Sequence, residues 1–170
     1  MERLHELLAS DHRRTLEFFA IGLLDVCGAD VDRRELFYNA SILAHHAEVS
    51  TASTTDWPAP AQLGDVFDHF VVEPSWRHDS DALEHAGAQC LLLSGFFADQ
   101  QRQRHNLGWY ATLGASFFHR SAREESSPAR ADLLEHLAEH FEPWRRRQEE
   151  LSRHLRASRY LVGPPSGLLM

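Results

Sequence analysis

Two segments without a single charged residue constrain this chain more than any other feature. They run over residues 86–98 (AGAQCLLLSGFFA) and 106–118 (NLGWYATLGASFF), and the polar link DQQRQRH separates them. A helix that is apolar on all sides is normally covered by protein on all sides. We therefore predict a buried helical hairpin over residues 79–123, at the centre of the fold.

Helical periodicity and helix punctuation recur along the rest of the chain, whereas strand signals are nearly absent. Asp32 and Glu35 have the spacing of a capping box, which predicts a helix start. Ser127, followed by a proline, predicts another. Ser10 is a candidate N-cap for a helix that ends near Gly28. The sequence thus favours an all-α fold.

The 170 residues and 43% apolar content suit one core. We expect a single-domain helical bundle of six or seven helices over residues 1–160, followed by an irregular tail over 161–170. The small polar residues and prolines of 51–60 indicate a loop, and a short helix is expected over 61–72.

Four glycines in the two uncharged segments suggest that the hairpin helices approach each other closely, despite a helix-propensity cost of about 1 kcal/mol each. They are Gly87, Gly95, Gly108 and Gly114. Replacing Gly95 or Gly114 with leucine is expected to overpack the hairpin and to cost at least about 1–3 kcal/mol.

Charge and composition exclude several classes of function. The net charge of -8 argues against a general nucleic-acid or anionic-membrane binder. All 17 basic residues are arginine, so no lysine nucleophile is present. Cys27 and Cys90 have no CxxC spacing and are expected to be buried thiols. No signal-peptide pattern or apolar stretch of bilayer length is visible, which predicts a cytoplasmic protein without a membrane span.

Twelve histidines make a metal or haem site inside the bundle a hypothesis worth testing. The candidate ligands are His12, His45, Glu48 and His85. The three histidines share helix faces with apolar residues, and Glu48, three residues after His45, could bring a carboxylate to the same region. The forward Glu-x-x-His order of di-iron bundles is missing from this set. Hydrogen-bonded core or boundary histidines remain the alternative explanation.

Aromatic residues of the uncharged segments are candidates for an apolar ligand pocket between the two helices. The pocket would be lined by Phe96, Trp109, Tyr110 and Phe117. Ordinary core packing explains the same pattern.

The C-terminal helix has a narrow apolar seam formed by Trp144, Leu151 and Leu155, at coiled-coil spacing. Residues 145–159 contain six arginines and two glutamates, a local +4 in an acidic chain. The seam and its charge predict a homo-oligomer, a dimer, formed through this helix. The alternative is that the seam closes the bundle within one molecule.

The stretch LLLSGFF, followed after the polar link by NLGWYATLGASFFHRSA, resembles a pattern in an uncharacterised family of bacterial helical proteins. The resemblance covers residues 91–122. It implies a bacterial origin and an all-α fold, and it transfers no functional residue because the family has no established activity.

Catalytic signatures are weak. Ser94 and Ser116 lie inside apolar helices and not in a Gly-x-Ser-x-Gly elbow, and no phosphate-binding loop is present. We therefore expect a non-catalytic protein that binds a small ligand or another protein and self-associates. A metal- or haem-dependent oxidoreductase is the second hypothesis.

Overall fold

The computed structural model describes residues 2–28, 30–52, 79–103 and 105–157, with side chains from residue 13 onward except those of 48–52. Within these ranges the chain forms seven helices and no strand, which confirms the predicted all-α bundle. The helices are α1 (Glu2–Cys27), α2 (Arg33–Ala52), α4 (Ser80–Ser94), α5 (Ala98–Gln101), α6 (Leu107–Glu124), α7 (Pro128–Glu139) and α8 (Phe141–Ala157).

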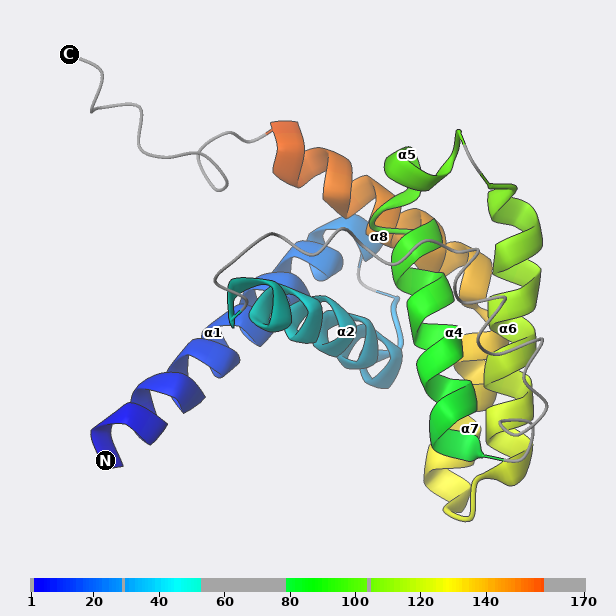
Figure 1. Ribbon diagram of the computed structural model, residues 1–170, viewed down its shortest axis with the longest axis horizontal. Helices are drawn as coiled ribbons and strands as arrows, with labels where there is room; N and C mark the ends of the chain where they lie inside the picture. Colours follow the sequence, from blue (N-terminus) through cyan, green and yellow to red (C-terminus); the bar gives the residue numbers. More distant parts are fainter. Residues whose placement is uncertain (1, 29, 53–78, 104, 158–170) are drawn as a thin grey trace.

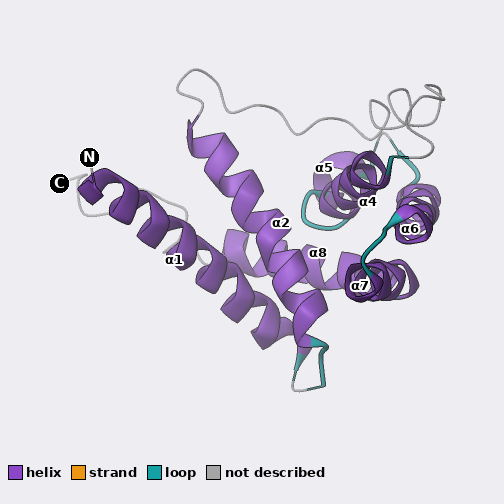
Figure 2. Cartoon of the chain, turned by 90° about the horizontal axis from the view of Figure 1, so that it is seen from below, coloured by secondary structure: helices purple, strands orange, loops and turns teal. Residues whose placement is uncertain are grey.

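The helices form two groups that share α8. Helices α4, α6 and α7 run side by side, while α1 and α2 contact each other beside them and diverge from their connecting turn as a V (Figures 1 and 2). Helix α8 lies between the groups and contacts α1 on one side and α4 and α6 on the other. One apolar core results, with buried side chains from α1, α2, α4, α6, α7 and α8.

Side-chain caps explain where the central helices begin. Asp79 accepts hydrogen bonds from the first backbone N–H groups of α4, and Asn106 does the same for α6. Ser127 caps α7, whose first residue is Pro128 as predicted. Each cap satisfies a backbone donor that the helix itself leaves unpaired.

The first two helices differ in detail from the sequence-based expectation. Helix α1 is continuous through Ser10, so that residue does not start a second helix. Gly28 ends α1 at a φ of 80°, a conformation that favours glycine. Asp32 caps α2 through its bonds to the N–H groups of Arg34 and Glu35. The capping box is incomplete, because the Glu35 side chain points into the protein.

The predicted central hairpin is present as α4 and α6, which pack against each other more extensively than any other two described helices. Helix α4 ends at Ser94 and α5 begins at Ala98, so the first uncharged segment is a helix, a turn and a new helix start. Leu91, Phe117 and Phe118 are buried in the interface, as expected for the core of the fold.

Three of the four hairpin glycines are close to neighbouring atoms. A Cβ at Gly114 would lie 2.4 Å from Cζ of Phe141. A Cβ at Gly95 would lie 2.7 Å from the Leu91 carbonyl oxygen, and one at Gly87 would lie 3.1 Å from the Phe118 ring. At Gly108 the nearest atom is 3.4 Å away, an ordinary contact, so close packing does not require that glycine.

None of the described helices combines the length and apolarity needed to cross a membrane. The predicted helix over 61–72, most of the loop over 51–60 and the boundary between residues 160 and 161 lie outside the described residues.

Candidate functional site

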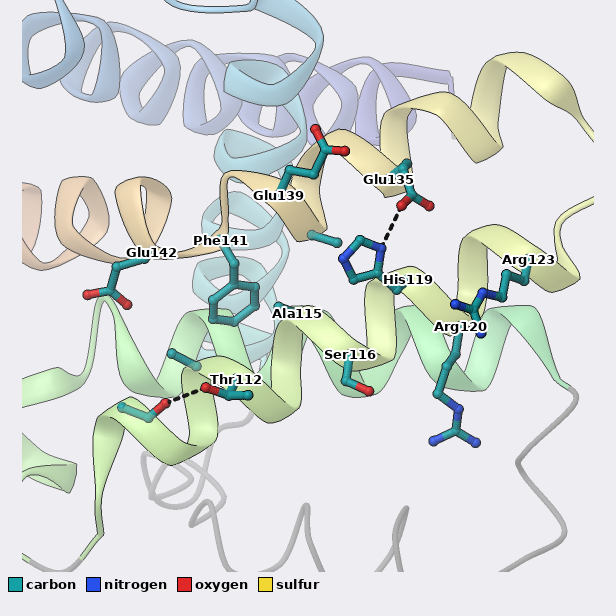
Figure 3. Close-up of a pocket in the computed structure, with 13 residues that line it drawn as sticks. Thr112, Ala115, Ser116, His119, Arg120, Arg123, Glu135, Glu139, Phe141 and Glu142 are labelled. Atoms are coloured by element: carbon teal, nitrogen blue, oxygen red, sulfur yellow. Dashed lines mark hydrogen bonds and ion pairs between the residues drawn. The ribbon is translucent and has the colours of Figure 1, made fainter.

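A groove of about 850 Å³ lies between α6 and the α7–α8 junction (Figure 3). Small residues, among them Ala111, Ala115 and Ala138, line it together with the ring of Phe141. Its polar lining residues are Thr112, Ser116, His119, Arg120, Arg123, Glu135, Glu139 and Glu142. The groove therefore offers both signs of charge beside an apolar floor.

Much of this polar lining is already paired within the protein. Nδ1 of His119 lies 2.7 Å from a carboxylate oxygen of Glu135. Glu142 accepts from Arg145 and Arg146, and these contacts hold the pKa of Glu142 below its ordinary value, Arg145 contributing most. Fewer of the charged side chains in this groove are therefore available to bind a ligand than its list of lining residues suggests.

The His119–Glu135 pair resembles two members of a hydrolytic triad, but the third member is not in place. Ser116 lies on the same helix, and Figure 3 shows its hydroxyl directed away from His119. A serine nucleophile must lie within hydrogen-bond reach of its base. The groove geometry therefore does not favour serine catalysis.

A second pocket, of about 300 Å³, lies between α2 and α4. It is lined by Ile42, His45, His46, His85, Ala88, Gln89 and Leu92. Leu92 is nearly buried, His46 is half-buried, and His45 and His85 are exposed. The pocket is thus apolar at its base and has imidazoles at its rim.

This pocket contains two of the four predicted metal ligands. His45 and His85 line it from α2 and α4, although both are exposed and not inside the bundle as expected. The side chains of His12 and Glu48 lie outside the described residues. Among the described side chains, no three of His, Cys, Asp or Glu are grouped so that they could hold a metal ion.

His46 completes the pocket and was missed by the sequence analysis. Its ring contacts the buried Phe97 edge to face, with ring centroids 5.0 Å apart. Burial lowers the pKa of His46 from 6.5, and the neighbouring charge of His45 lowers it further. His46 is four residues after Ile42, a helical neighbour, and that spacing is the sequence signal for its place here.

The four aromatic residues predicted to form an apolar pocket do not share one. Phe117 is fully buried, and Tyr110 is nearly so. Trp109 is 48% exposed, and Phe96 packs edge to face on Phe19 and Phe97. Core packing explains all but Trp109, because aromatic rings inside a helix bundle fill space between helices.

The seam on α8 is turned inward. Trp144 and Leu151 are 1% and 3% exposed, and Leu155 packs against the same core. Leu151 lies against α1, since a Cβ at Gly22 would be 2.9 Å from it. The prediction of a dimer interface made by these residues is therefore wrong, because they close the bundle within one molecule.

Comparison with models of known protein families, with curated proteins and with solved structures finds no match. The candidate sites are therefore defined by this chain's own side chains.

A different apolar surface is exposed on α1 and α2. Ile21 and Leu24 on α1 and Phe37 on α2 are 61%, 47% and 51% exposed, and they line a shallow groove of about 270 Å³. Phe18, one turn before Ile21, is 41% exposed. The period of Phe18, Ile21 and Leu24 is the sequence signal for this second apolar stripe of α1. We call these four residues the α1–α2 face.

A buried carboxylate is the other feature that the sequence did not reveal. Glu35 is 3% exposed and accepts hydrogen bonds from Nε1 of Trp144, at 3.2 Å, and from Nδ1 of His140, at 2.8 Å. Both partners lie more than a hundred positions along the chain, which no local pattern reveals. The carboxylate joins α2 to the α7–α8 junction.

Proposed function

We propose that this protein is a non-catalytic interaction protein that self-associates through the α1–α2 face. The observation that carries the proposal is the exposure of Ile21, Leu24 and Phe37 around one groove. Single exposed apolar residues are common, whereas contiguous groups of them mark interaction surfaces.

Charge favours a second copy of the chain as the occupant. Glu17 on α1 and Arg33 on α2 line the same groove, and neither has an ion-pair partner among the described side chains. Arg33 is at the start of α2, beside the turn, whereas Glu17 is almost three turns from the end of α1.

A two-fold axis through the groove would therefore place Glu17 of each copy near Arg33 of the other. Two α1–α2 faces packed against each other in this way would cover the exposed apolar side chains of both copies. Self-complementary charge of this kind sets the register of an interface and suppresses other partners.

The test is the molar mass in solution, by light scattering at tens of micromolar protein. We expect a dimer for the natural sequence and a folded monomer for the Ile21→Glu, Phe37→Glu double variant, because two carboxylates would have to be buried at the interface. Trp109→Glu is the matched control, since Trp109 is 48% exposed on α6, and it should leave the dimer intact.

Charge reversal tests the register. Glu17→Arg alone should weaken the dimer, and Glu17→Arg combined with Arg33→Glu should restore it. A natural protein that is monomeric at tens of micromolar would contradict self-association. A dimer that survives both Glu17→Arg alone and the Ile21→Glu, Phe37→Glu double substitution would contradict the α1–α2 face.

The oxidoreductase hypothesis has one observation in its favour, the presence of His45 and His85 in a single pocket. It predicts a transition metal or haem that copurifies in near-stoichiometric amount. Elemental analysis and an absorption spectrum test this. A colourless protein with less than about a tenth of an equivalent of metal would contradict it.

A further inference from the structure

We propose that His136 and His140 bind a divalent transition-metal ion of the zinc, nickel or copper class at the carboxyl end of α7. The Nε2 atoms of both rings are the protein ligands, and water completes the coordination. Neither histidine lines the pocket of His45 and His85 or the groove of the α1–α2 face, so this site is separate from both.

The two histidines are one helical turn apart. The N–H of His140 donates to the carbonyl oxygen of His136 at 2.9 Å, which closes the turn between them. Side chains at positions i and i+4 of a helix are neighbours, and a histidine pair at this spacing is a known zinc-binding arrangement. Here the ring centroids are 6.1 Å apart. With metal–nitrogen bonds of about 2.0–2.1 Å, two imidazoles on one ion have ring centres about 5 Å apart, so a small side-chain rotation brings both to the ion.

Hydrogen bonds to the protein fix the tautomer of each ring. Nδ1 of His136 lies 2.8 Å from the backbone carbonyl oxygen of Asp132, and Nδ1 of His140 lies 2.8 Å from the Glu35 carboxylate. A carbonyl oxygen and an ionised carboxylate only accept hydrogen bonds, so in each neutral ring Nδ1 carries the proton and Nε2 has the lone pair. Histidines that bind metal ions almost always have their second ring nitrogen bonded in this way.

Both rings are also open to solvent. The side chains of His136 and His140 are 36% and 48% exposed, and neither Nε2 has a hydrogen-bond or ion-pair partner among the described residues. The buried Glu35, which also accepts from Trp144, anchors the ring of His140 to the core. One ligand is therefore held in place before the ion binds, which reduces the entropy lost on binding.

The charge around the pair favours a cation. The carboxylates of Asp132, Glu35 and Glu139 all act electrostatically on His136, and only Asp132 is close to an arginine, Arg34, at 3.2 Å. The negative charge that remains attracts a positive ion.

The ligand type selects the ion. Imidazole nitrogens suit zinc, nickel and copper, whereas Mg²⁺ and Ca²⁺ require oxygen ligands. The described side chains contain no group of three metal ligands, so two imidazoles and water form an open site with modest affinity. Such an ion is lost during purification, and the amount of copurifying metal therefore does not test this proposal.

The test is an NMR titration of the untagged, metal-free protein with Zn²⁺, observed at the imidazole ring signals. We expect the rings of His136 and His140 to shift together with one dissociation constant of roughly 1–100 µM. Cu²⁺ should bind more tightly than Zn²⁺, in line with the general order of affinities for these ions. Ca²⁺ is the matched control of equal charge, and it should leave both rings unchanged at the same concentrations.

Three variants test the assignment of the ligands. His136→Ala should weaken Zn²⁺ binding at His140 by at least about tenfold, because one of two ligands is gone. Glu35→Gln keeps an acceptor for Trp144 but loses the carboxylate that positions His140, and it should weaken binding by about tenfold without loss of helical circular dichroism. His154→Ala is the control, because His154 is exposed on α8, and it should leave the affinity unchanged.

Several results would overturn the proposal. One is the absence of any shift of the two rings at roughly 1 mM Zn²⁺. A second is an equal effect of Ca²⁺, which would show only attraction to an acidic surface. A third is Zn²⁺ binding to His140 that is as tight in folded His136→Ala as in the natural protein. None of these measurements depends on the molar mass, so the metal site and self-association can each fail alone.

Discussion

The indole N–H of Trp144 donates to the buried carboxylate of Glu35 across 3.2 Å, which joins α8 to the first turn of α2. Nδ1 of His140 lies 2.8 Å from the same carboxylate oxygen. Next to this contact, Gln148 donates to Asn39 at 2.7 Å, and both side chains are fully buried. A polar row thus lies within an otherwise apolar interface, where it fixes one register between α2 and α8.

Removing the carboxylate should destabilise the protein. Glu35→Ala leaves the buried Trp144 N–H without an acceptor, a loss that typically costs about 1–3 kcal/mol in the free energy of unfolding. Glu139→Ala, at an exposed glutamate of α7, should change that free energy by less than about 0.5 kcal/mol. Urea denaturation of both variants measures the difference, and equal stabilities would contradict the structural role of Glu35.

The hairpin glycines give a second contrast. Gly114→Ala would place a Cβ 2.4 Å from Phe141 and 2.8 Å from Cβ of Cys90, both buried, and should cost about 1–3 kcal/mol. Gly108→Ala has room and should be neutral or stabilising by up to about 1 kcal/mol, because alanine favours helix more than glycine does. Thermal unfolding compares the two, and a Gly114→Ala protein as stable as the parent would show that the helices can separate.

Charged substitutions in the α8 seam should unfold the protein, because the seam is part of the core. Substitutions in a dimer interface would instead dissociate the dimer. The Trp144→Glu, Leu151→Glu double variant buries two carboxylates in the core and should lose its helical circular dichroism. The milder Leu151→Ala should cost about 2–5 kcal/mol, and Leu155→Ala less, because Leu155 is only partly buried. A double variant that is folded and monomeric would restore the seam as a dimer interface.

The pKa values of two histidines should be shifted in opposite directions. The pKa of His46 is lowered from 6.5 by burial, whereas the pKa of His136 is raised from 6.5, chiefly because its ring donates to the Asp132 carbonyl. NMR titration of the ring protons should therefore find His46 below and His136 above that value. The reverse order would contradict both environments.

These two pKa shifts make the free energy of unfolding change with pH in opposite directions. The unfolded chain binds a proton at His46 more readily than the folded chain does. The contribution of neutral His46 to the free energy of unfolding is therefore lost as the pH falls through 6.5 toward the lower folded pKa. The contribution of His136 is fully present below 6.5 and is lost as the pH rises through its folded pKa. His46→Gln should flatten the acid side of the stability profile, and His136→Gln should flatten the other side.

The fold was largely predictable because its signals are local. Uncharged segments identify α4 and α6, and Asp32 and Ser127 mark helix starts through bonds to backbone only two or three residues away. The prediction of a helix start at Ser10 was wrong because serine occurs inside helices as well as at their N-caps. Only the backbone, which is helical on both sides of Ser10, distinguishes the two cases.

The candidate sites depended on pairings that no local pattern contains. The sequence showed the apolar seam of α8 but not which surface covers it. An apolar helix face can pack equally well against a second molecule or, as here, against α1. Glu35 was predicted to belong to a capping box because it lies three residues after Asp32. That spacing cannot show that the side chain of Trp144 approaches Glu35 in the fold. His45 and His85 line one pocket but are exposed, because exposure depends on the spacing between α2 and α4, which cannot be read from the sequence.

The position of α8 has a consequence for how the chain folds during synthesis. Trp144 and Glu35 are 109 positions apart, and α8 contacts α1 at the opposite end of the chain. Such distant contacts are slow to form, and domains fold as units once their chain has left the ribosome. Helices α1 and α2 must therefore wait, with their core faces towards α8 uncovered, until α8 has left the ribosome. A ribosome-bound chain that stops before α8 should recruit chaperones that a chain including α8 no longer needs.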